Sequence, residues 1–213
     1  MRKSVMILLS TLLLTAAGQL SRADVSVGLS VDDDGLKAFH LAIGEHYQVP
    51  ERQVVLVREK NVPEEELPVV FFLARRADVD PSVIVKLRLG GYSWMEITAK
   101  YGLSAEIYYV AFDRDPGPPY GNAWGHFKNR HRKEWGSIHL TDAEVVNFVN
   151  LKFMCEKYGY TPADVVKMRV RGDDFVKINK QVKAGKGKSA QKPDARADSD
   201  PPKAKAKGKG NNK

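Results

Sequence analysis

Cysteine is nearly absent from this sequence, which contains only Cys155 among its 213 residues. A single cysteine excludes an internal disulfide framework, a haem-attachment CxxCH motif and a cysteine-rich zinc site. It also leaves no cysteine near the N-terminus to which a lipid could be attached. The sequence contains no GxSxG, HExxH or phosphate-loop motif. We therefore expect a protein that is not an enzyme and that uses neither a metal nor a cofactor.

Long hydrophobic runs are also missing, and the one short run lies at the N-terminus. Val5–Leu14 is an apolar stretch of about 10 residues, well short of the roughly 20 that span a bilayer. Arg2 and Lys3 precede it, and Ser21–Ala23 then places small residues where a signal peptidase cleaves. This pattern predicts a cleaved signal peptide over residues 1–23 and a periplasmic or secreted mature chain beginning at Asp24.

Excess positive charge is confined to the two ends of the chain. The sequence has 34 Lys+Arg and 26 Asp+Glu, a formal net charge of +8. Residues 1–23 carry +3 and residues 180–213 carry +8, so residues 24–179 carry −3. A nucleic-acid-binding domain is often suggested by such a basic chain, but here the expected folded part is mildly acidic.

The C-terminal segment, residues 184–213, has no apolar periodicity and consists largely of Lys, Ala, Gly, Pro, Ser and Asp. Such a composition cannot bury enough surface to offset the entropy of ordering, so we expect a disordered Lys-rich tail. Its expected partners are anionic: lipid, an envelope polymer or nucleic acid. The candidate contacts in the tail are Lys203, Lys205, Lys207 and Lys209.

A repeat at an offset of 81 residues occupies the middle of the chain. Residues 71–97 align with residues 152–178 without a gap. The recurring structural positions are Pro81, Arg88 and Trp94 in one copy and Pro162, Arg169 and Phe175 in the other. A weaker copy lies upstream, where Pro50 and Arg58 take similar places with a spacing one residue longer. We expect two or three repeated units.

Each copy carries the signals of three short helices. Asp80 supplies an N-cap and Pro81 a favourable first helical residue. Gly91 follows the second helix as a stop signal. Ser93 and Glu96 then form the capping-box pattern that begins a third helix. The sequence therefore predicts an all-α fold, with helical units at 24–112 and 141–183.

Several polar residues near the repeat are candidates for a functional role. An arginine in the last turn of a helix can satisfy carbonyls and favour the negative end of the helix dipole. We interpret Arg88 and Arg169 in this structural way, with ligand binding as the alternative. Glu64–Glu66 has the pattern of a helix start. Cys155 aligns with Ala74, which predicts a small buried position and not a nucleophile.

The segment between the two copies, residues 113–140, is rich in Pro and Gly and is predicted to be a loop. Aromatic and basic side chains alternate in it, a pattern that can hold an anionic polymer by charge and stacking. The interpretation that we favour is a loop that packs on the helices through its aromatic residues. The candidate polyanion contacts are Trp124, Trp135, Lys128, Arg130, Arg132 and Lys133.

One stretch, Leu87–Val110, has the pattern of a helix-turn-helix motif, with Gly102–Ser104 at the turn. Its second helix would begin at Ala105 and would contain Glu106 and Asp113 but no Lys or Arg. Phosphate contacts need basic residues, so DNA reading is the less favoured interpretation.

The wider pattern, over about residues 36–182, resembles exported bacterial helical proteins of no assigned function. The resemblance rests on the segments LPVVFFLARRA, VIVKLRLGG and SWMEITAKYGL. It implies an exported helical protein and supplies no activity. We expect an exported non-enzymatic binding or scaffold protein whose basic tail contacts anionic envelope components. The alternative is a nucleic-acid or polyanion binder that uses the helix-turn-helix-like segment, the 128–133 cluster and the tail.

The signal-peptide hypothesis predicts that the mature protein begins at Asp24, because cleavage after Ala23 satisfies the small-residue requirement. Intact-mass measurement of protein recovered from the cell envelope should show a chain that has lost residues 1–23. A full-length mass in the membrane fraction would contradict the predicted localisation.

Overall fold

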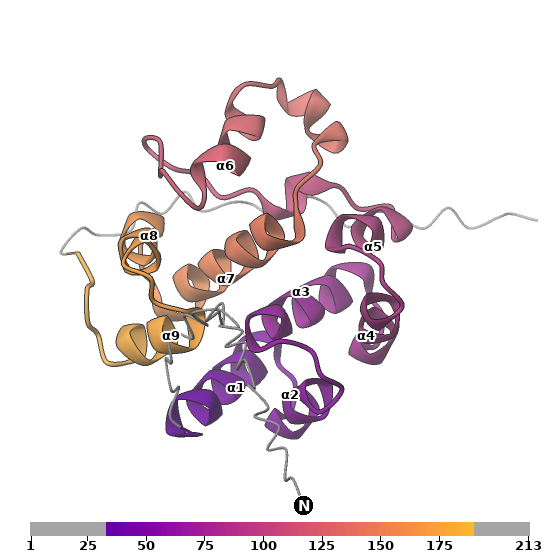
Figure 1. Ribbon diagram of the computed structural model, residues 1–213, viewed down its shortest axis with the longest axis vertical. Coiled ribbons are helices and arrows are strands. Elements are labelled where there is room, and N and C mark those ends of the chain that lie inside the picture. Colours follow the sequence, from indigo (N-terminus) through magenta and orange to yellow (C-terminus); the bar gives the residue numbers. More distant parts are fainter. Residues whose placement is uncertain (1–32, 190–213) are drawn as a thin grey trace, which may run out of the picture. The chain divides into compact units, whose positions relative to one another are not determined.

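The computed structural model describes residues 33–189, and these residues form helices and connecting turns (Figure 1). Within this range there are nine α-helices and three 3-10 helices and no strand, which confirms the all-α class. The predicted signal peptide and the tail beyond Ser189 lie outside the described residues. No described helix has both the length and the apolar character needed to cross a membrane.

The helices are mostly short. Only α1 and α7 exceed eleven residues, and short helices are marginal alone because their nucleation is costly. The elements are α1 (Asp33–Tyr47), α2 (Glu51–Arg58), η1 (Glu64–Glu66), α3 (Leu67–Ala77), α4 (Pro81–Leu89), α5 (Trp94–Lys100), η2 (Ala105–Tyr108), α6 (Gly121–Lys128), η3 (Arg132–Ser137), α7 (Asp142–Tyr158), α8 (Pro162–Val170) and α9 (Phe175–Lys183).

The two strong copies of the repeat have matching helices. We call α3–α5 the middle unit and α7–α9 the downstream unit. Pro81 and Pro162 begin helices of nine residues each. Trp94 and Phe175 begin the next helices, and both side chains are 0 % exposed. The predicted repeat therefore corresponds to a repeated helical unit with equivalent buried aromatic residues.

The weaker copy also corresponds to repeated structure, which we call the upstream unit, α1–α2. Arg58, Arg88 and Arg169 are each the eighth residue of their helix. Pro50 therefore lies just before its helix, at the position that Asp80 occupies in the middle unit. The sequence alignment, which paired Pro50 with the helix-starting prolines, is corrected by one residue, and this shift accounts for the longer spacing.

Backbone conformation supports the alignment of all three units. A left-handed residue redirects the chain after a helix, and such residues recur here with φ between 56° and 90°. They follow the first helix at Gln48, Asp78 and Gly159, and the second helix at Asn61, Gly91 and Gly172. Non-glycine residues adopt this conformation infrequently, so its recurrence at equivalent places marks a shared chain path.

The units are joined through their long first helices. In Figure 1, α3 and α7 lie side by side, and they contact each other. The same α3 packs on α4, whereas α7 packs on α8 and α9. α1 contacts both long helices as well as α9. Residues Leu67–Ala74 of α3 are all buried, because neighbours surround this helix on several sides.

The segment predicted to be a loop, residues 113–140, contains α6 and η3, which corrects the sequence analysis. Its helical turns are stabilised by burial of aromatic side chains and not by capping residues. Phe127 packs edge-on to both Phe148 of α7 and Trp135, with ring centroids 6.1 and 5.1 Å apart. Glycine and proline composition therefore misled the prediction for this segment.

The helix-turn-helix-like stretch has no second α-helix. After α5 the chain forms η2, a 3-10 helix of four residues. Ala105, Ile107 and Tyr108 of this short helix are buried. A recognition helix must present its side chains to a DNA groove. This part of the alternative interpretation is therefore wrong.

The first residues of the predicted tail are packed against α8, and we call residues 184–189 the strap. The hydroxyl of Tyr160 donates to the backbone oxygen of Lys186 at 2.8 Å. Ser189 donates to Asp164 from its backbone nitrogen and its hydroxyl, at 3.2 and 2.7 Å. The folded body therefore extends at least to Ser189, past the predicted boundary at residue 184.

Replacing the buried aromatic residue that begins α9 should unfold the protein more easily. We expect Phe175→Ala to lower the free energy of unfolding by about 3–5 kcal/mol, as for other large core truncations. Val170→Ala is the control, because Val170 is 62 % exposed and its truncation should change stability by less than about 0.5 kcal/mol. Urea denaturation of both variants tests this, and a loss below about 1 kcal/mol for Phe175→Ala would contradict the repeat assignment.

Candidate functional site

The repeated arginines all bind one short acidic segment, η1. Each of the three consecutive glutamates in η1 forms an ion pair with the arginine of a different unit. The pairs are Glu64 with Arg58, Glu65 with Arg169, and Glu66 with Arg88. The sequence pattern predicts a helix start at these glutamates but does not reveal that they are the partners of the arginines.

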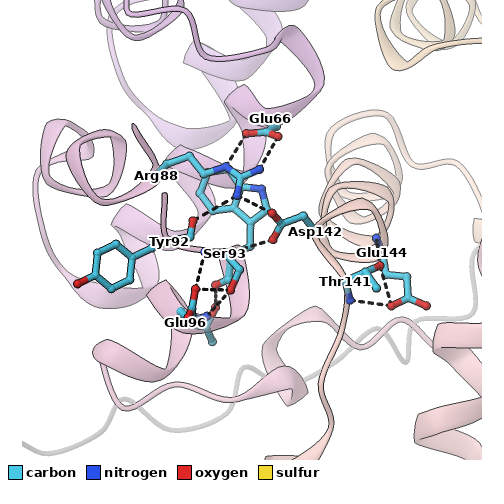
Figure 2. Close-up of polar contacts among 10 residues, drawn as sticks. Glu66, Arg88, Tyr92, Ser93, Glu96, Thr141, Asp142 and Glu144 are labelled. Atoms are coloured by element: carbon cyan, nitrogen blue, oxygen red, sulfur yellow. Dashed lines mark hydrogen bonds and ion pairs between the residues drawn. The ribbon is translucent and has the colours of Figure 1, made fainter. Parts of the chain in front are cut away.

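In the middle unit, Arg88 is held from several sides (Figure 2). Its Nε and Nη2 atoms donate to the two carboxylate oxygens of Glu66 at 3.0 and 2.8 Å. Its Nη1 atom donates to Asp142 and to the backbone oxygen of Tyr92. The guanidinium also lies 4.6 Å from the ring centroid of Trp94. The other oxygen of Asp142 accepts the backbone N–H of Trp94 at 2.8 Å.

The downstream unit repeats this arrangement around Arg169. Its two terminal nitrogens donate to Glu65 at 2.9 and 3.1 Å. Nη1 also donates to the backbone oxygen of Asp173 at 3.1 Å, four residues on, as Arg88 does to Tyr92. The guanidinium lies 4.5 Å from the ring centroid of Phe175, whose backbone N–H donates to Glu65 at 2.8 Å.

These contacts give both arginines a structural role. Each side chain is only 21 % exposed and makes a bidentate pair, the strongest geometry for a guanidinium and a carboxylate. The hydrogen bonds that Arg88 donates to Glu66 raise the pKa of Arg88, although burial opposes this effect. The acceptors are chiefly carboxylates of η1 and not, as the sequence analysis assumed, carbonyls of the arginines' own last turns.

Glu64, the first glutamate of η1, joins the upstream unit. His40 Nε2 on α1 lies 2.7 Å from Glu64 Oε2, and Arg58 binds the other carboxylate oxygen. Burial by itself would raise the pKa of Glu64, but hydrogen bonds from His40 and Arg58 lower it. This carboxylate is therefore held in its charged form as part of the same network.

The second candidate site is the cationic loop, which we define as Lys128–Lys133. It includes the end of α6 and the start of η3, and all six of its residues are exposed. Its four cations are Lys128, Arg130, Arg132 and Lys133. Acidic residues are absent from these six positions, and Glu134 follows directly.

The tryptophans predicted to stack on a ligand are instead buried beneath this loop. Trp124 is 8 % exposed and Trp135 is 9 % exposed. The Trp135 indole donates to the backbone oxygen of Phe127 at 3.1 Å. The loop's own cations lie over the two rings, Lys128 at 4.6 Å from the Trp124 centroid and Arg132 at 5.4 Å from the Trp135 centroid. The indoles therefore position the cations and do not offer open stacking surfaces.

A small cavity of about 40 Å³ adjoins the cationic loop. Three cations and one carboxylate contribute to its wall, so its local charge is positive. Nε of Arg132 donates to Glu106 at 2.9 Å, and Nζ of Lys152 donates to the backbone oxygen of Ile107 at 3.4 Å. The lining residues are Arg76, Glu106, Ile107, Tyr109, Arg132, Trp135 and Lys152.

Other reactive groups in the described part of the chain do not form a site of their own. Over residues 33–189, no group of three or more His, Cys, Asp or Glu side chains is placed to hold a metal ion. Cys155 is partly buried, where a fully buried position was predicted, and burial of its thiol raises its pKa, which disfavours the nucleophilic thiolate. The four candidate lysines of the tail, from Lys203 to Lys209, lie outside the described residues.

No family model, curated protein or solved structure matches this chain.

Removing the charge of Glu65 should destabilise the fold. Glu65→Gln keeps the shape of the side chain but leaves the partly buried Arg169 without its ionic partner, so we expect a loss of about 1–3 kcal/mol in the free energy of unfolding. Glu134→Gln is a matched control on an exposed residue and should cost less than about 0.5 kcal/mol. Equal urea midpoints for the two variants would show that the η1 pairs contribute nothing to stability.

Proposed function

We propose that this protein is an exported, non-enzymatic helical module that binds anionic components of the cell envelope. Binding is carried mainly by the basic C-terminal segment, with the cationic loop as a second contact. The observation that supports this proposal best is the cationic loop itself, in which four cations are exposed and two of them, Lys128 and Arg132, lie over buried indole rings.

The cationic loop is suited to a polyanion because its cations are close together and held in place. Lys128 and Arg132 lie over buried indole rings, so these two side chains are already partly ordered in the free protein. Ligand binding therefore costs less side-chain entropy. The positive cavity beside Arg132 extends the same surface. Charged oxygens of a polymer or a lipid headgroup would meet several cations at once.

The C-terminal part of the chain has most of the excess positive charge that a polyanion could contact. Residues 24–179 carry a net charge of −3 and residues 180–213 carry +8, of which +4 belongs to residues 180–189 of the folded body and +4 to residues 190–213. At physiological salt, exposed charges are screened beyond about 8 Å, so the tail cations act where the tail itself makes contact. The repeated arginines cannot contribute, since Arg88 and Arg169 are already bound by carboxylates.

The proposal predicts that tail and loop differ in their share of binding. In the full-length mature protein, Lys203, Lys205, Lys207 and Lys209 changed together to Gln should sharply weaken binding to heparin, to vesicles containing an anionic lipid and to DNA. The slope of log affinity against log salt should fall by up to about four, because each lost anion contact removes about one. Titrations at several salt concentrations measure both quantities.

The matched comparison removes the same number of charges from the folded body. Lys128, Arg130, Arg132 and Lys133 changed together to Gln should produce a smaller loss of affinity. Circular dichroism should show unchanged helix content for both variants, because the replaced side chains are exposed or lie in the tail. A larger loss for the loop variant would make the loop the main site. Full affinity in both variants would overturn polyanion binding as the function.

A further inference from the structure

The strap covers α8 through specific hydrogen bonds and one close packing contact. Tyr160, Asp164 and Met168 lie along the outer side of the downstream unit and are 5, 2 and 1 % exposed. Tyr160 and Asp164 hydrogen-bond to the strap. The Met168 methyl group lies so close to Gly187 that a Cβ there would come within 2.7 Å of it.

The equivalent positions of the middle unit are less well covered. They are Val79, Val83 and Leu87, which we call the α4 strip. Val83 is 40 % exposed, and the other two are partly exposed, although α2 packs against α4. After α5 the chain leaves toward η2 and α7, so the middle unit has no strap of its own.

A cavity of about 330 Å³ opens at one end of the α4 strip. Its wall combines apolar side chains with the phenol of Tyr47, two carboxylates and one guanidinium. The lining residues are Tyr47, Val49, Phe71, Ala74, Arg75, Asp78, Val79, Asp80 and Pro81. Exposed Asp78 and Asp80 stand where the downstream unit has the uncharged Gly159 and Thr161.

The strap meets α8 through the tripeptide Lys186-Gly187-Lys188. Lys186 supplies the carbonyl that Tyr160 binds. Gly187 has a φ of 76°, a conformation that favours glycine. The ammonium group of Lys188 lies 3.5 Å from the backbone oxygen of Tyr158 and 5.6 Å from the ring centroid of Tyr160. This seat thus uses the backbone carbonyl of Lys186, the left-handed Gly187 and the ammonium group of Lys188, whereas Lys186 itself is exposed.

The same tripeptide occurs once more in the chain, as Lys207-Gly208-Lys209. We propose that this tail tripeptide docks on the α4 strip of its own molecule, as the strap docks on α8. The two ammonium groups would face Asp78 and Asp80, and the backbone around Gly208 would cover Val83. This inference rests on the repeat and on the strap, and it uses two of the lysines proposed to bind a polyanion, so a bound polyanion should compete with the docking.

The length of the tail and the high effective concentration of a tethered segment favour docking within one molecule. Eighteen residue steps separate Ser189 from Lys207, and they span up to about 60 Å when extended. A folded body of this size has a radius of gyration of about 15 Å, so every part of its surface lies within that span. A tethered segment also acts at a higher effective concentration than a second copy at ordinary protein concentrations.

Photo-crosslinking in the full-length mature protein tests the docking directly. With p-benzoylphenylalanine in place of Val83, irradiation should join this position to the tail while the protein keeps the mass of a monomer. Cleavage before Asp200 releases residues 200–213 as one peptide, which mass spectrometry can then identify in the crosslink. The same crosslinker in place of the exposed Lys86 should capture the tail far less.

Two matched substitutions separate a specific seat from simple charge attraction. Gly208→Val keeps every charge but disfavours the left-handed backbone, so the crosslink yield at position 83 should fall about tenfold. Gly210→Val makes the same change outside the tripeptide and should leave the yield unaltered. A synthetic peptide of residues 203–213, added to the Gly208→Val protein, should restore crosslinking at position 83.

Three results would overturn the docking proposal. Equal losses for Gly208→Val and Gly210→Val would show that the tripeptide has no special role. Crosslinks that join two chains would show that the seat takes a second copy. Crosslinks from position 83 that contain no tail peptide, with no capture of the added peptide, would show that the α4 strip does not bind this segment.

Discussion

The fold depends on one arrangement, in which three consecutive glutamates each bind an arginine of a different helical unit. A 3-10 helix has three residues per turn, so its successive side chains point about 120° apart. Glu64–Glu66 forms such a helix. This geometry explains how neighbouring carboxylates reach three separate units, since an extended segment would send them to two opposite sides. Each arginine is the eighth residue of its helix, and the repeat therefore brings equivalent groups to one acidic turn.

The pairs differ in how much chain they connect. Arg58 lies six residues from Glu64, whereas Arg169 lies 104 residues from Glu65. The distant pair joins the downstream unit to the turn that precedes α3, and Glu65 also accepts the first backbone N–H of α9. Partly buried ion pairs can contribute little net stability, because removing charges from water is costly. Their bidentate geometry nevertheless restricts how the units can dock, so their main effect is on the choice of one arrangement.

Local signals in the sequence predicted where individual helices lie better than they predicted which residues the helix side chains bind. The capping box of Ser93 and Glu96 is present, as is that of Thr141 and Glu144. Caps act within a few residues, so the sequence contains all that they need. The pairing of Arg169 with Glu65 depends on how distant units dock, and no local pattern specifies it. The sequence nevertheless contains three repeated arginines and three adjacent glutamates, and this match could have suggested the ion pairs.

The segment 113–140 shows the opposite case, where a local signal was present but outweighed. Tyr120, Trp124 and Phe127 have the i, i+4, i+7 spacing of one helix face, and all three are buried. Glycine content obscured this pattern, because two glycines in an eight-residue helix lower its intrinsic propensity. Aromatic burial overcomes that cost and leaves the intervening polar residues facing outward. The exposure of the cationic loop is thus a consequence of the aromatic core beneath it. Side chains of this segment that point inward stabilise the fold, and those that point outward are available to anionic ligands.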